Sequence, residues 1–274
     1  MLYIVATPIG NLDEITLRAL DVLKSVDLIA AEDTRHTALL LGKYGITTKT
    51  VAYHKFNERA SVDGLIAKLR SGADIAVVSD AGMPTVSDPG HVLIDSAIEN
   101  DVPFTVVSGA CAAVDALVLS GLDTRAFCVL GFLPEKNIDR TRFVEPYKKL
   151  PSTLVFYSSV HNIKSDLEFF YKTFGARRCA VCREMTKLYE TVTRGMLGSM
   201  PEITEKGEFA VVIEGAGTEC ELNSLSVEEH LRHYIGGGMN ERDAIKKTAA
   251  DRHVCKNEVY KVAVELKNGG KSPQ

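Results

Sequence analysis

The stretch DIAVVSDAGMPTVSDPGHVLIDSAIEN, residues 74–100, contains one complete strand–loop–helix unit. Residues 74–79 form a short, Val-rich apolar run typical of a buried strand, and residues 91–100 carry apolar side chains at helical spacing. The loop between them holds two Ser-Asp pairs, two glycines and two prolines, which is more than an ordinary turn needs. The stretch therefore predicts an α/β fold and a loop that does more than reverse the chain.

The same alternation of strand and helix extends outward from this unit over the first 120 residues. Strands are expected at residues 2–6, 27–31, 50–53 and 103–108, each followed by a helical pattern. Such alternation predicts a mainly parallel sheet covered by helices.

The strand pattern restarts after Gly121-Leu122-Asp123. Further strands are expected at residues 127–132, 153–159, 176–185 and 208–215. Residues 188–195 alternate in the manner of a strand and are expected to pair antiparallel with a neighbour.

The length of 274 residues exceeds that of a usual single domain and suggests two domains with an appendage. We expect an N-terminal α/β domain at residues 1–114, a second α/β domain at 115–222 and a helical appendage at 223–274. Residues 240–274 carry 8 Lys/Arg and 5 Asp/Glu, a local charge of +3 on a chain of net charge −4. A basic tail of this kind is typical either of a nucleic-acid contact or of a solvated helical cap.

Composition is that of an ordinary soluble globular protein, with 45% hydrophobic and 25% charged residues. No apolar run has the roughly 18 residues of a membrane span, and the N-terminus lacks the features of a signal peptide. We therefore expect a cytoplasmic protein with no membrane partner. Cys179 and Cys182 are interpreted as buried thiols on a strand, because no second cysteine pair stands at metal-binding spacing. No metal site is expected.

Two loops of similar composition follow predicted strands: residues 6–12, ATPIGNL, and the loop after residue 79. Ligands of open α/β sheets bind beyond the carboxyl ends of the strands, so two such loops on neighbouring strands predict one shared pocket. Ordinary turns with Asp helix caps would explain the same residues. A P-loop is absent, and the glycine-rich fragment at 215–220 lacks the third glycine of a dinucleotide site, which disfavours NAD.

Several blocks of the chain closely resemble one known family. They are LYIVATPIGNLDEI (2–15), LIAAEDTRHT (28–37), HKFNE (54–58), VSDAGMPTVSDPG (78–90) and LYETVTRG (188–195). These blocks resemble, in order, the ribosomal small-subunit RNA 2′-O-ribose methyltransferase I family of the tetrapyrrole methylase superfamily. The resemblance implies two αβα domains with S-adenosylmethionine (SAM) in the cleft between them, and a homodimer. It implies as substrate the 2′-hydroxyl of a cytidine in the decoding region of small-subunit rRNA, with the 30S particle as partner.

The resemblance also implies which residues hold the cofactor. These are Pro8, Asp80, Ala81, Gly82, Met83, Pro84, Ser87, Asp88, Ala112 and Tyr157. Two blocks near the implied cleft depart from the family pattern. Residues 108–112 read Ser-Gly-Ala-Cys-Ala where the family usually has Pro-Gly-Pro-Ser-Ala, and residues 157–161 read Tyr-Ser-Ser-Val-His where it usually has Tyr-Glu-Ser-Pro-His.

Candidate catalytic residues lie in the family blocks that follow strands of the first sheet. Asp33 is a candidate proton acceptor, Arg35 a candidate phosphate ligand, and His54 or Glu58 a candidate base or ribose ligand. Asp33 would also serve as a helix N-cap before Thr34, so both interpretations stay open.

Two other functions remain open at this point. A methyltransferase of a small, tetrapyrrole-like molecule would need a deep substrate pocket without a basic rim. A non-catalytic, SAM-dependent ribosome-assembly factor would bind rRNA without modifying it, and the two altered blocks are what favours it.

Overall fold

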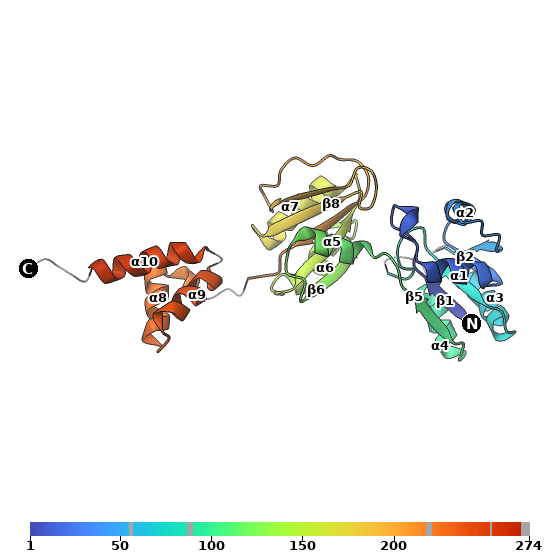
Figure 1. Cartoon of the computed structure of the whole chain (residues 1–274), viewed down its shortest axis with the longest axis horizontal. Helices are drawn as coiled ribbons and strands as arrows, with labels where there is room; N and C mark the ends of the chain where they lie inside the picture. The colour runs from blue at the N-terminus through green and yellow to red at the C-terminus, as the bar shows by residue number, and fades with distance from the viewer. Residues whose placement is uncertain (55–56, 87–89, 218–220, 253, 270–274) are drawn as a thin grey trace, which may run out of the picture. The chain divides into compact units, whose positions relative to one another are not determined.

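The computed structural model describes residues 1–54, 57–86, 90–217, 221–252 and 254–269. Contacts divide the chain into two compact units: residues 1–145 with 152–214, and residues 146–151 with 215–274 (Figure 1). Within the described ranges, no helix combines the length and apolarity needed to cross a bilayer.

The first sheet is built from residues 2–107. Its strands are β1 (Leu2–Val5), β2 (Leu28–Ala31), β3 (Thr50–Ala52), β4 (Ile75–Val78) and β5 (Phe104–Val107). They pair in the order β3-β2-β4-β1-β5, and every pairing is parallel. The predicted parallel sheet is confirmed. Parallel pairing is possible because each connection contains a helix that carries the chain back to the end of the sheet where the next strand starts.

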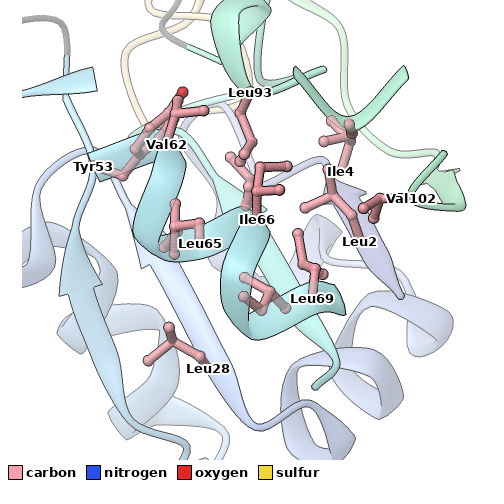
Figure 2. Close-up of a cluster of buried hydrophobic side chains, with 14 residues drawn as sticks. Leu2, Ile4, Leu28, Tyr53, Val62, Leu65, Ile66, Leu69, Leu93 and Val102 are labelled. Atoms are coloured by element: carbon pink, nitrogen blue, oxygen red, sulfur yellow. The ribbon is translucent and has the colours of Figure 1, made fainter. Parts of the chain in front are cut away.

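Helices cover both faces of this sheet. They are α1 (Leu17–Ser25), α2 (Thr34–Lys43), α3 (Glu58–Arg70) and α4 (His91–Glu99), with a 3-10 turn at Leu12–Glu14. Successive strand residues point to opposite faces. Leu2 and Ile4 therefore pack in the cluster that holds α3 and α4, shown in Figure 2, whereas Val5 packs in the cluster of α1 and α2.

The second sheet is mixed rather than parallel. Its strands are β6 (Phe127–Phe132), β7 (Thr153–Ser158), β8 (Arg178–Arg183), β9 (Thr191–Met196) and β10 (Phe209–Ile213), in the order β6-β7-β10-β8-β9. Only β6 and β7 pair in parallel; the other pairs of this sheet are antiparallel. The expected antiparallel pairing of the 188–195 segment is confirmed, but β9 begins at Thr191. Residues 187–189 instead form a turn.

Helices also lie on both faces of the second sheet, which confirms the predicted fold of two αβα domains. The helices are α5 (Ala112–Ser120), α6 (Asn137–Val144) and α7 (Ile163–Phe174). A 3-10 turn at Glu145–Tyr147 directly follows α6. Helix α5 packs on β7, β8 and β10. On α7, Phe170 packs against Phe156 of β7, with ring centroids 4.5 Å apart and the rings tilted by 39°. The expected boundary after residue 114 falls inside α5.

Cys179 and Cys182 lie on β8 and are both buried, as interpreted from the sequence. Burial raises the pKa of the Cys179 thiol to about 12 and that of Cys182 to about 11, because the thiolate form is disfavoured away from water. Both thiols are therefore protonated and unreactive at neutral pH.

The second unit is helical. It contains a 3-10 turn at Glu221–Ser224 and helices α8 (Val227–Gly236), α9 (Glu241–Asp251) and α10 (Lys256–Gly269). Ser226 and Glu229 form a reciprocal capping box at the start of α8, and the Asn240 side chain caps α9 by accepting from the Asp243 amide. A small apolar core, including Leu231, Ile245 and Val259, holds the three helices together.

Candidate functional site

The loops after β1 and β4 are joined by their backbones. The Thr7 amide donates to the Gly82 carbonyl at 2.8 Å, and the Gly82 amide donates to the Thr7 carbonyl at 3.0 Å. The Thr7 hydroxyl adds a bond to the Ser79 carbonyl at 3.1 Å. The sequence expectation that these two loops lie together is confirmed, because β1 and β4 are neighbours in the sheet.

Gly82 has a conformation and surroundings that favour glycine. Its φ is +76°, in the region that side chains with a Cβ rarely adopt. A Cβ there would lie 3.5 Å from Cγ2 of Ile9 and 3.8 Å from the Ala110 carbonyl oxygen. The loop after β4 therefore places bare backbone against the loop after β1.

These loops form one wall of a pocket with a volume of about 460 Å³, within the size range of cofactor sites. The rest of the lining comes from α5 and from the second sheet. The lining residues are Ile9, Ala81, Gly82, Met83, Val86, Cys111, Ala112, Phe132, Tyr157, Ser158, Ser159, Val160, Met185, Gly207, Glu208, Phe209 and Ala210. Among these described residues Glu208 is the one charged side chain, and none is Lys or Arg. The pocket thus suits a ligand that has apolar parts to bury and carries no phosphate groups.

The pocket brings together half of the predicted cofactor residues. Ala81, Gly82, Met83, Ala112 and Tyr157 line it, whereas Pro8, Asp80 and Pro84 do not. Pro8 and Pro84 are buried beside lining residues, where they stiffen the two loops. The predicted residues Ser87 and Asp88 lie outside the described part of the chain.

Sequence reasoning missed the lining from β6, β10 and the loop before β10. Phe132, Gly207 and Phe209 come from these segments, and an ordinary strand pattern gives no sign that they face a ligand. The sequence did point to three other lining residues, Cys111, Ser158 and Val160, because they belong to the two blocks near the implied cleft that depart from the family pattern.

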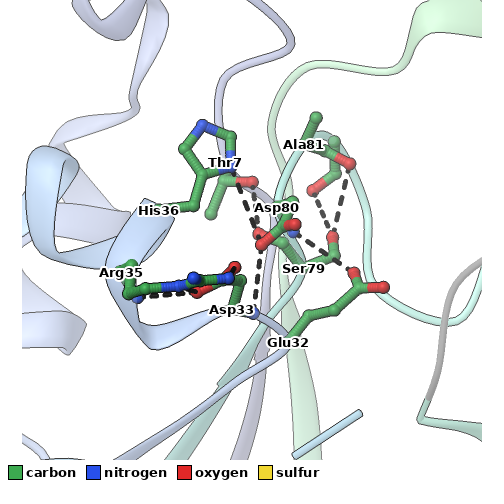
Figure 3. A network of polar contacts seen from close by, with 9 residues as sticks. Thr7, Glu32, Asp33, Arg35, His36, Ser79, Asp80 and Ala81 are labelled. Carbon is green, nitrogen blue, oxygen red and sulfur yellow. Dashed lines mark hydrogen bonds and ion pairs between the residues drawn. The ribbon is translucent and has the colours of Figure 1, made fainter. Parts of the chain in front are cut away.

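A polar network lies at the carboxyl ends of β2 and β4 (Figure 3). The Asp80 carboxylate accepts from the Asp33 amide at 3.1 Å, and Nδ1 of His36 lies 3.7 Å from the same oxygen. The Asp33 side chain caps α2 and forms a bidentate pair with Arg35, with the shorter contact at 2.6 Å. The structure thus brings Asp33, Arg35 and Asp80 together, and it adds His36, which the sequence did not single out.

The two neighbouring carboxylates of this network differ in basicity. The hydrogen bonds and charge of Arg35 hold the pKa of Asp33 well below its usual range. Burial raises the pKa of Glu32, and the charges of Asp80 and Asp33 raise it further. A hydrogen bond from the Asp80 amide and the nearby His54 lower it, but the net shift is upward. Glu32 is therefore the stronger proton acceptor of the two.

Glu58 is placed in a supporting position. Its Oε1 accepts from the Tyr53 hydroxyl at 3.1 Å and from the Gly90 amide at 2.8 Å. These contacts tie the start of α3 to β3 and to the start of α4. The His54 amide donates to the Asn57 side chain at 2.8 Å, which shapes the turn before α3.

A buried ion pair supports the pocket from behind. Nη1 of Arg140 lies 3.0 Å from Oδ1 of Asp166, and both side chains are at least nine-tenths buried. The Ser158 hydroxyl donates to Oδ2 of Asp166 at 2.7 Å, and Nε of Arg140 donates to the Pro134 carbonyl at 2.7 Å. This network fixes the end of β7, where Ser158 lines the pocket.

Among the described residues, no group of three or more His, Cys, Asp and Glu side chains is placed to hold a metal ion.

Comparisons with known proteins point to one family. Residues 1–201 match the family model of tetrapyrrole (corrin/porphyrin) methylases. The chain is 44% identical over 270 residues to ribosomal RNA small subunit methyltransferase I of Halalkalibacterium halodurans, covering 95% of this chain and 93% of that protein. It is 38% identical to the protein of the same name from Synechocystis sp., with 98% and 99% covered.

Solved structures agree on the fold. Uroporphyrin-III-C-methyltransferase from Thermus thermophilus superimposes with a TM-score of 0.56 at 22% identity, covering 78% of this chain and 93% of that one. Diphthine synthase gives a TM-score of 0.61 at 12% identity, covering 79% and 90%.

Proposed function

Because this chain belongs to the tetrapyrrole methylase family, and within it to the ribosomal RNA small subunit methyltransferase I family, we propose that it methylates small-subunit rRNA with SAM as donor. The acceptor we propose is the ribose 2′-hydroxyl of a cytidine in the decoding region. The observation that carries the proposal is the pocket at the carboxyl ends of β1 and β4, combined with near full-length similarity to rRNA methyltransferases. A ribosomal substrate would place the activity in the cytoplasm.

The residues present fit SAM. Its adenine ring and the carbon chain of its methionine part match the apolar lining around Ile9, Met83 and Phe132. Its sulfonium cation and its lack of phosphate match the lack of Lys and Arg in that lining. Backbone polar groups of the loops that Gly82 brings close offer hydrogen bonds to the ligand's polar ends. When bound, SAM supplies an electrophilic methyl group.

The chain's own part in the reaction is to position the ribose and to take its proton. Holding two reactants in line supplies much of the rate gain in such transfers. A 2′-hydroxyl is a poor nucleophile at neutral pH, and a general base adds about 10²–10⁴-fold. We propose Glu32 as that base, because burial raises its pKa whereas Arg35 lowers that of Asp33. His54 lies close enough to Glu32 to lower the pKa of its carboxyl group.

Asp33 and Arg35 are then proposed to hold the RNA. The Arg35 guanidinium is exposed, and the Asp33 carboxylate fixes its direction at the start of α2. A guanidinium held in this way can bind a phosphate with two parallel hydrogen bonds.

We also propose a homodimer. The edge strands β5 and β6 expose apolar side chains, namely Phe104, Val106, Phe127 and Val129, and α5 exposes Val114 and Val118. Edge strands with exposed apolar side chains are prone to associate, and a second copy of the chain would cover them.

The test is methyl transfer from labelled SAM to small ribosomal subunits from a strain that lacks this gene, followed by mass mapping of the rRNA. We expect one ribose methyl at one cytidine. Methylation of a tetrapyrrole-like molecule instead would support the small-molecule alternative. Binding of the subunits with no transfer would support the assembly-factor alternative.

A further inference from the structure

A groove of about 570 Å³ opens between α9 and α10 in the helical unit. Its walls carry Arg242 and Lys246 from α9, and Lys256, Asn257 and Tyr260 from α10. All five residues are exposed. The groove is therefore a surface feature that the small core of this unit does not use.

The cations of the groove differ from the other cations of the same helices. Lys247 pairs with the buried Asp251 at 3.2 Å, and Arg252 donates to His230 and to backbone carbonyls, so both serve the packing of the unit. Arg242 and Lys256 form no ion pair within 4 Å with any residue of the described ranges, and Lys246 reaches only Asp243, at 3.3 Å. With Glu241 as the one acidic side chain of the lining, the groove keeps a net positive charge.

The backbone strengthens this charge. The N-cap residue of α9, Asn240, and the first residue of α10, Lys256, both border the groove. Two helix N-termini therefore add their partial positive charges to those of the three cations. Tyr260, one turn beyond Lys256, adds an exposed aromatic ring, and Asn257 adds an amide with donors and an acceptor.

We propose that this groove binds a single-stranded segment of rRNA, with Arg242 and Lys256 on backbone phosphates and Tyr260 stacked on one base. The inference rests on the proposed function, and it gives the helical unit the role of anchoring the substrate. Phosphates fit the cations and the helix N-termini, and a flat base fits the exposed ring. An acidic protein segment would use the cations but not the ring.

The experiment measures binding of the full chain to small ribosomal subunits and to the RNA extracted from them, at several salt concentrations. The test variants are Arg242→Gln with Lys256→Gln, and Tyr260→Ala. The matched control is Lys261→Gln, which removes one charge from α10 outside the groove. SAM affinity, measured by calorimetry, should be the same in all variants.

We expect the double variant to bind both RNA forms about tenfold more weakly. The slope of log K against log salt should fall by about 1.4, since each phosphate contact on single-stranded RNA contributes roughly 0.7. Tyr260→Ala should weaken binding with little change in the slope, and Lys261→Gln should resemble wild type.

Unchanged affinity and slope in the double variant would overturn the inference. Weaker binding to subunits with unchanged binding to extracted RNA would also overturn it, because the occupant would then be a ribosomal protein. Methyl transfer by the wild-type protein is scored separately, so a failure of the proposed function is distinguished from a failure of the groove.

Discussion

Asp166→Asn tests the buried network behind the pocket. The substitution keeps the side-chain volume but removes the charge that faces Arg140 at 3.0 Å. Both side chains are at least nine-tenths buried, so the guanidinium would remain in the interior without its counter-ion. Removing one partner of such a pair lowers the free energy of unfolding by about 3–5 kcal/mol. For a unit of this size, each kcal/mol lowers Tm by roughly 2–4 °C, which gives a fall of about 6–20 °C.

The assay is thermal unfolding followed by circular dichroism, with Glu168→Gln as the matched control. Glu168 lies on the same helix, α7, and its exposed carboxylate is 3.9 Å from Lys172. Exposed pairs of this kind contribute little to stability, so the control should unfold close to wild type. Replacing both partners, Arg140→Met with Asp166→Leu, should recover much of the lost stability, because no unpaired charge remains buried. Equal Tm values for Asp166→Asn and Glu168→Gln would refute the reasoning.

Four further outcomes are expected. Gly82→Val puts a branched side chain at φ +76° beside Ile9. It should weaken SAM binding at least tenfold, about 1.4 kcal/mol. Unchanged affinity by calorimetry in the folded variant would contradict this. Glu32→Gln should lower kcat about 10²–10⁴-fold, because the general base is lost. In the wild-type protein the rate should rise as the pH rises through the raised pKa of Glu32, because a base works when it is deprotonated. A variant that keeps this rise in its pH–rate profile would exclude Glu32. Val106→Asp with Phe127→Asp should shift the protein from dimer to monomer in sedimentation, whereas a wild-type monomer would end the dimer proposal. Small subunits should be far better acceptors than a short oligonucleotide at physiological salt, since the net charge of −4 gives little bulk attraction to RNA; equal rates would contradict this.

The fold could be predicted from the sequence because its signals are local. Short apolar runs such as residues 74–79, with helical patterns between them, indicate a parallel sheet without knowledge of distant contacts. The second sheet shows the limit. Whether β10 pairs with β7 or with β6 depends on long-range packing, so the sequence predicted its strands but not its mixed order. The ends of elements were also less certain, as β9 shows by starting three residues later than expected.

The candidate site could be predicted where a loop composition was unusual, and not where an ordinary strand residue faces the ligand. The loop after β4 was identified because glycine and proline serve backbone geometry that other residues cannot adopt, and Gly82 has that geometry. Phe132 and Phe209 are typical strand residues, so their position in the pocket follows only from the folded chain.

The contrast between Glu32 and Asp33 shows why residue type alone could not assign a catalytic role. The sequence presents two adjacent carboxylates, Glu32 and Asp33, and its motif pointed to Asp33 as the candidate proton acceptor. Folding gives one of them a guanidinium and a capping role at the start of α2, which stabilises its ionised form. It gives the other a partly buried position, and burial favours its protonated form although the Asp80 amide donates a hydrogen bond to it. A carboxylate with a raised pKa is the stronger general base of the two. The environment, rather than the side chain, therefore separates the residue proposed to help position the RNA from the residue proposed to take its proton.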